Sequence, residues 1–254
     1  MLEICVEDHA GLAAALDGGA DRIELCSALA IGGITPSAGL IATAAAMPVP
    51  VHVLLRPRGG DFVYGPEEAA ILVADLDRAA QAGVAGVVIG ATTTGGALDT
   101  ALLARLIART RKWSEQRAEP LSITLHRAFD LCPDQSAALE IAILLGFDRI
   151  LTSGGAATAL AGRDRLAALV AQAGGRIGIL PGSGIDANNA PAILATGVSE
   201  LHASCGVSVM QDADLVRLGF APATSRRTDR DRVAALKSAM MTDDQKLRLS
   251  KTNS

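Results

Sequence analysis

The sequence predicts one α/β domain folded as a closed (β/α)₈ barrel of the TIM type, and three observations lead to this prediction. The chain has 254 residues, a length that such barrels commonly occupy as one domain. Short apolar runs alternate with longer Ala-rich stretches, as in βαβ units around a parallel sheet. A similar stretch recurs four times along the chain, at intervals that fit eight strands.

The expected strands are short runs rich in Val, Ile and Leu, the composition of parallel strands covered on both faces. They are residues 2–6, 22–26, 50–56, 86–90, 122–127, 149–152, 176–180 and 200–204. The intervening stretches are helical in pattern, and Asp134 is expected to cap one of them. The clearest helices are residues 66–82, 98–111, 136–145 and 160–173.

The recurring stretch is a glycine followed at once by a strand. It begins at Gly19, Gly83, Gly146 and Gly197, and glycine is the usual residue where a helix ends. Each interval holds two β/α units, so these glycines precede strands 2, 4, 6 and 8. Four double units favour a closed eight-stranded barrel, and an open doubly wound sheet is the structural alternative.

The last fifth of the chain departs from this pattern. We expect residues 1–205 to form the barrel and residues 206–254 to form a C-terminal loop and helix that pack on it or extend it. Within that segment, residues 221–232 are polar and predict a surface loop. Residues 233–247 predict an amphipathic helix, and residues 250–254 predict a frayed end.

Composition excludes several classes of function. Aromatic residues make up 2% of the chain and the net charge is −4, which argues against a nucleic-acid partner. No apolar run is long enough to cross a membrane, and the N-terminus lacks the pattern of a signal peptide. The four cysteines form no CxxC pair, so we expect them to be reduced in the cytoplasm.

Polar residues alternate with apolar ones along several expected strands, and their side chains therefore share one face. The outer face of a barrel packs on helices, so the polar face is expected to point into the lumen. A structural ion-pair network through Arg22, Arg56 and Arg149 is one interpretation, and a functional site is the other. The expected lumen residues are Glu3, Glu24, His52, Arg56, His126, Glu200 and His202.

Acid–base chemistry and anion binding are expected at the strand ends. Glu24, His126 and Glu200 are candidate acid–base residues, with Asp130 as partner of His126; an Arg127–Asp130 clamp is the alternative. The loops after strands 3, 6 and 7 combine Arg or Ser with glycines, as anion sites do, although geometric turns would have the same composition. The candidate anion-binding residues are Arg56, Arg58, Ser153, Gly154, Ser183 and Gly184.

Two cysteines end neighbouring strands on the same face. Cys5 and Cys26 lie on strands expected about 4.8 Å apart, and two thiolates suit Cu(I). The alternative is that both are small buried hydrophobic residues. Cys205 is expected to be structural, and Cys132 is expected in the loop after strand 5.

Several blocks recur in the order that a known family shows. They are Leu2-Glu-Ile-Cys5, Gly19-Ala-Asp-Arg-Ile-Glu-Leu-Cys26, Arg56-Pro-Arg-Gly-Gly-Asp-Phe62, His126-Arg-Ala-Phe-Asp130, Arg149-Ile-Leu-Thr-Ser-Gly154 and Glu200-Leu-His202. Through residue 205 the chain resembles the CutC family of copper homeostasis proteins. That resemblance implies a cytoplasmic, often dimeric TIM-type barrel that binds copper through Cys5 and Cys26. Residues 206–225 depart from the family pattern.

Two functions follow as hypotheses. The first is Cu(I) binding in copper homeostasis, through Cys5 and Cys26, by a cytoplasmic homodimer. The second is a barrel enzyme of unspecified reaction that acts on a small anionic or phosphorylated metabolite at the carboxyl ends of the strands.

Overall fold

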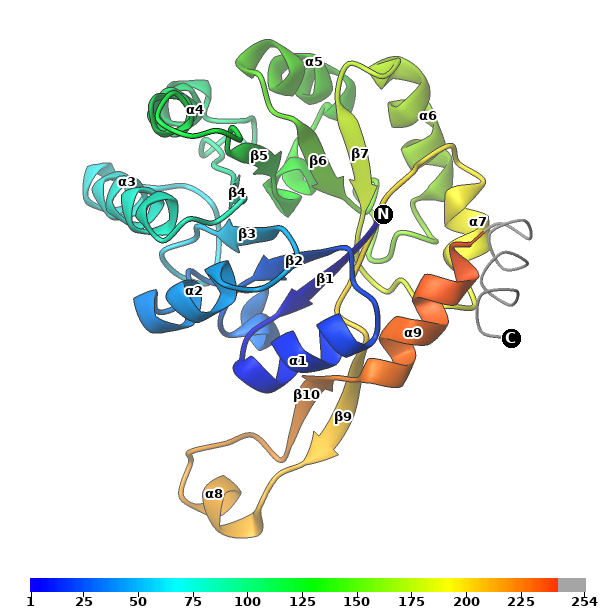
Figure 1. Cartoon of the computed structure of the whole chain (residues 1–254). Coiled ribbons are helices and arrows are strands. Elements are labelled where there is room, and N and C mark those ends of the chain that lie inside the picture. The colour runs from blue at the N-terminus through cyan, green and yellow to red at the C-terminus, as the bar shows by residue number, and fades with distance from the viewer. Residues whose placement is uncertain (242–254) are drawn as a thin grey trace.

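The computed structural model describes residues 1–241, and its centre is a sheet of eight parallel strands (Figure 1). The hydrogen-bonded order is β7-β6-β5-β4-β3-β2-β1-β8, which is the chain order of a TIM-type barrel with β8 placed beside β1. The strands are β1 Leu2–Val6, β2 Arg22–Leu25, β3 Val51–Leu54, β4 Gly86–Ile89, β5 Ser122–Leu125, β6 Arg149–Thr152, β7 Gly178–Pro181 and β8 Leu201–Ala203.

Helices cover the outside of this sheet. All eight expected strands and the four clearest expected helices are present, with ends that differ by a few residues. Two short 3₁₀ helices, η1 Leu29–Ile31 and η2 Arg127–Leu131, follow β2 and β5. The α-helices around the barrel are α1 His9–Asp17, α2 Ala38–Ala45, α3 Pro66–Gln81, α4 Thr100–Ser114, α5 Gln135–Leu145, α6 Arg163–Ala173 and α7 Ala190–Leu194.

The prediction of a TIM-type barrel is confirmed, and the barrel is nearly closed. Within residues 1–241, β7 and β8 contact each other but form no hydrogen-bonded ladder, so the sheet has two edges there. Pro181 ends β7 and has no N–H to donate, which suits an edge strand. The seam also lies beside the shortest barrel strand, β8.

The repeated glycines do what the sequence predicted. Gly19, Gly83, Gly146 and Gly197 have φ between 86° and 94°, a left-handed conformation that residues with a Cβ rarely adopt. Each one reverses the chain between a helix and an even-numbered strand. The prediction of four double β/α units is therefore confirmed.

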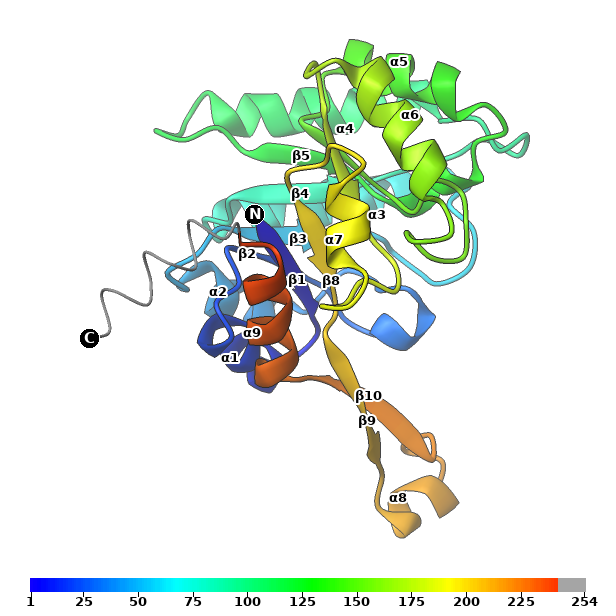
Figure 2. The same cartoon turned by 90° about the vertical axis from the view of Figure 1, so that its right-hand side faces the viewer.

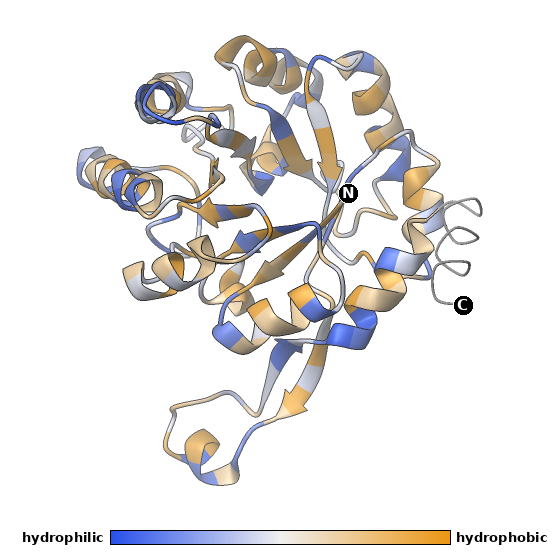
Figure 3. Ribbon diagram, viewed as in Figure 1, coloured by the Kyte–Doolittle hydropathy of each residue, from blue (hydrophilic) through white to orange (hydrophobic). Residues whose placement is uncertain are grey.

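Two apolar layers stabilise the barrel. The larger lies between strands and helices and includes Leu2, Ile4 and Val6 of β1. The smaller lies in the lumen, where Cys5, Cys26, Leu54 and Val88 contact one another. Figure 3 shows hydrophilic positions inserted among the hydrophobic ones along the strands, as expected when one face of a strand packs on helices and the other faces a polar lumen.

The segment after β8 forms an arm that extends away from the barrel (Figure 2). Its strands β9 Gly206–Met210 and β10 Thr224–Thr228 pair antiparallel, and α8 Ala213–Arg217 lies at its tip. The prediction of a loop over residues 221–232 was wrong. The β-branched ends of β10, Thr224 and Thr228, pair with Met210 and Gly206, so strand pairing overrode the polar composition.

The chain returns from the arm to the barrel through α9, Arg230–Ala239. Val233 and Leu236 are fully buried, and Lys237 forms an ion pair with Asp21 near the start of β2. α9 begins before the expected residue 233. The expected continuation to residue 247 and the expected frayed end at residues 250–254 lie outside the described residues.

In the part of the chain that the structure describes, no helix combines the length and apolar character needed to cross a bilayer.

Candidate functional site

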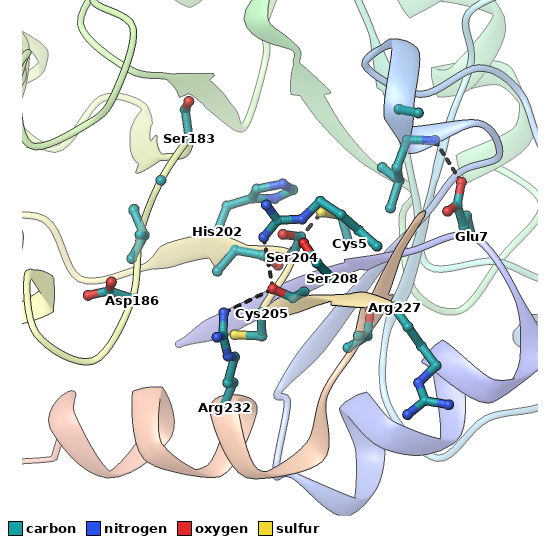
Figure 4. Close-up of a pocket in the computed structure, with 18 of the residues that line it drawn as sticks. Cys5, Glu7, Ser183, Asp186, His202, Ser204, Cys205, Ser208, Arg227 and Arg232 are labelled. Carbon is teal, nitrogen blue, oxygen red and sulfur yellow. Dashed lines mark hydrogen bonds between the residues drawn. The ribbon is translucent and has the colours of Figure 1, made fainter. Parts of the chain in front are cut away.

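A cavity of about 820 Å³ opens at the carboxyl ends of the strands, between the barrel and the base of the arm (Figure 4). The loop after β7 forms one wall, and β9, β10 and the start of α9 form another. The floor is the lumen end of β1 and β8. The residues that line it include Cys5, Glu7, Asp8, Arg127, Ser183, Gly184, Ile185, Asp186, His202, Cys205, Arg226, Arg227 and Arg232.

The two strand-end cysteines lie together in the lumen. Cys5 of β1 is opposite Glu24 of β2 in the register, and Cys26 follows β2. Both thiols belong to one small buried cluster with Leu54 and Val88. Cys5 also lines the cavity, whereas Cys26 is fully buried. The expected proximity on one face is therefore present, with Cys5 on the accessible side.

A buried ion-pair network lies below the cysteines. Arg22 Nε donates to Glu3 at 2.5 Å, and its Nη2 donates to Glu200 at 2.6 Å. Glu3 also accepts a 2.7 Å hydrogen bond from His202 Nδ1. Burial opposes ionisation, but the hydrogen bond from His202 and the charge of Arg22 hold the pKa of Glu3 well below its usual range. The interpretation of Arg22 as part of an internal ion-pair network matches this geometry.

Glu24 is the one carboxylate of the lumen that keeps an unpartnered buried oxygen within residues 1–241. Its Oε2 makes no hydrogen bond and lies 3.7 Å from His202 Nδ1. Burial, and then repulsion from Glu3, raises the pKa of Glu24 to about 7. Glu3, Glu24 and His202 each offer one atom that could ligate a metal, and these three atoms all lie within 4.8 Å of one another. This arrangement can accept either a proton or a cation.

Charge on His202 balances these carboxylates. Although burial opposes protonation, the neighbouring Cys5 and Glu24 and the hydrogen bond to Glu3 raise the pKa of His202 well above its ordinary value. His202 is thus held protonated next to the Cys5 thiol. Its place at the cavity floor makes it part of the site, although the predicted acid–base residues did not include it.

Glu200 lies at the opposite end of the barrel from the cavity. It directly precedes β8, and its carboxylate pairs with Arg22 and, at 3.6 Å, with Arg149. Both arginines begin their strands. The structure therefore places Glu200 at the amino ends of the strands, so its expected place among acid–base residues at the carboxyl ends is wrong.

His126 is buried in a pocket of its own after β5. Its Nδ1 accepts a 3.1 Å hydrogen bond from the amide of Ala128, so its proton is on Nε2, which has no partner within residues 1–241. Its ring lies 4.8 Å from the ring of Phe62, in space left by Gly90. Burial, then the charge of Arg56, lowers the pKa of His126 to about 3.

The expected pairing of His126 with Asp130 is wrong. Asp130 pairs instead with Arg127 Nε at 2.8 Å and accepts hydrogen bonds from Thr152 and from the Ser153 hydroxyl and amide. The physical reason is η2, which begins at Arg127: the ring of His126 caps this helix, and the helix turns Asp130 toward β6. The alternative Arg127–Asp130 clamp is the arrangement found.

Most of the expected anion-binding groups are occupied by protein acceptors. Arg56 is buried and donates to the carbonyl oxygens of three loop residues. Arg58 pairs with Glu68 and Asp61. The Ser153 hydroxyl donates a hydrogen bond to the Asp130 carboxylate, and the Gly154 amide donates one to the Thr152 hydroxyl. None of these four lines the cavity; the two that do are Ser183 and Gly184.

The residues that the sequence argument missed come from the arm and α9. Arg226 and Arg232 line the cavity, but both lie in the stretch that was predicted to be a surface loop. Cys205 also lines it, with φ of 47° and less than a tenth of its surface exposed, so its expected structural role is combined with a place in the wall. Cys132 is buried in the outer core and does not line the cavity.

Comparison with known proteins agrees with this architecture. The sequence model of the CutC family matches residues 1–207. A protein from Sinorhizobium medicae named as a CutC family protein is 48% identical over 242 residues, which cover 94% of this chain and 96% of that protein. A CutC protein from Caulobacter vibrioides is 49% identical over 238 residues, covering 92% and 94%.

Solved structures extend the comparison. The crystal structure of a CutC protein from Streptococcus agalactiae has 33% identity and a TM-score of 0.74, and the match covers 80% of this chain and 98% of that one. Thiamine phosphate pyrophosphorylase from Pyrococcus furiosus has 15% identity and a TM-score of 0.54, with 94% of each chain covered, and is alike in fold alone. By the family match and by these relatives, the chain belongs to the CutC family.

Proposed function

We propose that the protein binds Cu(I) through Cys5 and Cys26 and serves copper homeostasis in the cytoplasm, as a homodimer. The observation that carries this proposal is the presence of both thiols in one small buried cluster at the ends of adjacent strands. Thiolates are soft ligands that suit Cu(I), the form expected in a reducing compartment. The Streptococcus agalactiae relative is described as a candidate copper homeostasis protein.

The surroundings of the thiols fit a cation. Burial, and then the negative charge of Glu24, raises the pKa of the Cys26 thiol well above its ordinary value. Cys26 therefore stays protonated until a cation replaces its proton, and binding becomes weaker as the pH falls. The unpartnered oxygen of Glu24 adds negative charge near the cluster. Cys5, which lines the cavity, provides the route by which the ion enters.

A competition titration against a chromophoric Cu(I) chelator tests the proposal. The native protein is expected to take up one Cu(I) per chain, and Cys5→Ser with Cys26→Ser is expected to abolish this uptake. Cys132→Ser is the matched control, because it removes a buried thiol that lies outside the cavity lining. Unchanged affinity in the double variant would refute copper binding at this cluster. Size-exclusion chromatography with light scattering tests the dimer.

The size of the cavity favours a second candidate function. A single metal ion fills a small part of about 820 Å³, whereas sites for small molecules commonly measure roughly 300–1,000 Å³. Glu24 does not line the cavity, but its Oε2 lies 3.7 Å from Nδ1 of His202, which does. With its pKa raised to about 7, Glu24 has the proton affinity of a general acid–base near neutral pH. The second candidate is therefore a barrel enzyme that acts on a small anionic metabolite in this cavity.

A thermal-shift screen of small carboxylates and phosphate esters tests the second candidate. A ligand that binds the cavity is expected to raise the melting temperature of the native protein. Turnover of that ligand is expected to fall in Glu24→Gln, with its binding retained, because the amide cannot exchange the proton. The absence of any stabilising anion would refute this candidate and leave the copper proposal standing.

A further inference from the structure

Two arginine side chains at the base of the arm converge on one carbonyl oxygen. Arg226 Nη2 lies 2.8 Å from the oxygen of Gly206, and Arg232 Nη1 lies 3.0 Å from the same atom. Two guanidinium groups that share one acceptor are held close together, and their charges repel. Within residues 1–241, neither arginine has a carboxylate at ion-pair distance. The two arginines therefore form no ion pair among the described residues.

The carboxylates of the cavity wall are held by backbone amides rather than by the two arginines. Glu7 accepts from a loop amide at 2.7 Å, and Asp8 caps α1 at 2.6 Å. Asp186 accepts from two amides of its own turn at 2.8 and 3.1 Å. Each carboxylate is thus held by hydrogen bonds from backbone amides, and among residues 1–241 none forms an ion pair with Arg226 or Arg232.

The wall formed by the loop after β7 offers backbone donors. Ser183 and Gly184 have φ of 83° and 69°, so the chain turns sharply here in the left-handed conformation. Together with Ile185 they line the cavity, and their three amides donate no hydrogen bond within residues 1–241. Successive free amides in such turns bind anions, and the end of strand 7 is a common phosphate position in barrels of this type.

We propose that Arg226 and Arg232, with the amides of residues 183–185, bind the phosphate group of a phosphorylated small molecule. An anion with oxygens on several sides can accept from both guanidinium groups and from the free amides, and it removes the repulsion between the arginines. The rest of the cavity, toward Cys5 and His202, then holds the organic part of the ligand. This inference rests on the second candidate function and names its substrate class.

Isothermal titration with inorganic phosphate at low ionic strength tests the proposal. We expect Arg226→Ala and Arg232→Ala each to raise the dissociation constant by roughly 10-fold or more, the effect of losing one charge-assisted hydrogen bond. Arg217→Ala is the matched control. It removes the same charge from the same arm, but Arg217 belongs to α8 and is not among the residues that line the cavity. The affinity of this control variant for phosphate is expected to stay within about twofold of the native value.

A second measurement follows the backbone donors. In a ¹⁵N–¹H spectrum, phosphate is expected to shift the amides of residues 183–185 in the native protein and not in the Arg226→Ala, Arg232→Ala double variant. Phosphate that binds with native affinity to that double variant would overturn the arginine site while leaving an anion-binding cavity standing. Failure of the native protein to bind phosphate would overturn the arginine site outright, and the thermal-shift screen then decides the second candidate separately.

Discussion

Replacing Gly90 by alanine is a direct test of how the barrel makes room for His126. A Cβ at this position would lie 2.3 Å from Cε1 and 2.4 Å from Nδ1 of the His126 ring. Ordinary contacts between such atoms are about 3.5–4.0 Å, so the ring has to move by more than about 1 Å. The Phe62 ring, 4.8 Å away, and the hydrogen bond from Ala128 oppose that movement.

The cost follows from these two constraints. Forcing the ring aside in a packed interior costs about 1–3 kcal/mol, and losing the hydrogen bond to Ala128 costs about 0.5–1.5 kcal/mol. We therefore expect Gly90→Ala to lower the free energy of unfolding by about 1.5–4.5 kcal/mol. Urea unfolding followed by the fluorescence of the single tryptophan, Trp113, measures this change.

A double-mutant cycle separates the clash from other effects of the substitution. In the His126→Ala background the ring is absent, so Gly90→Ala is expected to cost less than about 1 kcal/mol, with the difference appearing as coupling energy. Gly39→Ala is the control, because nothing lies within 4 Å of its added Cβ. An equal cost of Gly90→Ala with and without His126 would refute the reasoning.

Two further predictions concern the buried charges. Arg22→Met leaves Glu3 ionised and buried, so we expect it to cost about 3–5 kcal/mol at neutral pH, and less when Glu3→Gln accompanies it. Because the folded-state pKa of Glu3 is depressed, this cost should shrink as the pH falls below about 4.5; a pH-independent cost in urea unfolding contradicts the assignment. Burial lowers the pKa of His52 and of His126 to about 3, so both should stay neutral at pH 5 while His202 is protonated, as read from ring carbon shifts in NMR spectra. Both depressed values also predict stability that is present above pH 6.5 and is lost as the pH falls toward 3; a neutral His202 at pH 5 would contradict the network described here.

The strand and helix pattern is readable from the sequence because it depends on local periodicity. The glycines that precede even-numbered strands identify eight units, and their positive φ angles follow from the same local requirement at each helix end. The alternation along β1 likewise places Cys5 and Glu3 on one face and Leu2 and Ile4 on the other, since side chains of a strand alternate.

Other features depended on partners distant in sequence. His126 and Asp130 are close along the chain, yet they do not pair. The Asp130 carboxylate instead accepts hydrogen bonds from Thr152 of β6 and from Ser153, which follows it. Arg58 carries a charge suited to an anion, but Glu68, ten residues later on α3, already binds it. Composition identifies a side chain that can bind an anion. It does not tell whether an acceptor of the protein itself already occupies that side chain in place of the anion.

By itself the sequence determined the family, the barrel of eight strand–helix units and the polar lumen, because local periodicity and blocks of adjacent residues carry that information. Only the tertiary structure decided that, within residues 1–241, no hydrogen-bonded ladder joins β7 to β8, and that residues 206–228 form an arm. It also brought Arg226 and Arg232 to the cavity wall beside Cys5 and His202. All of these features depend on contacts between segments far apart in the chain. The packing of one strand or helix against another determines which side chains remain accessible.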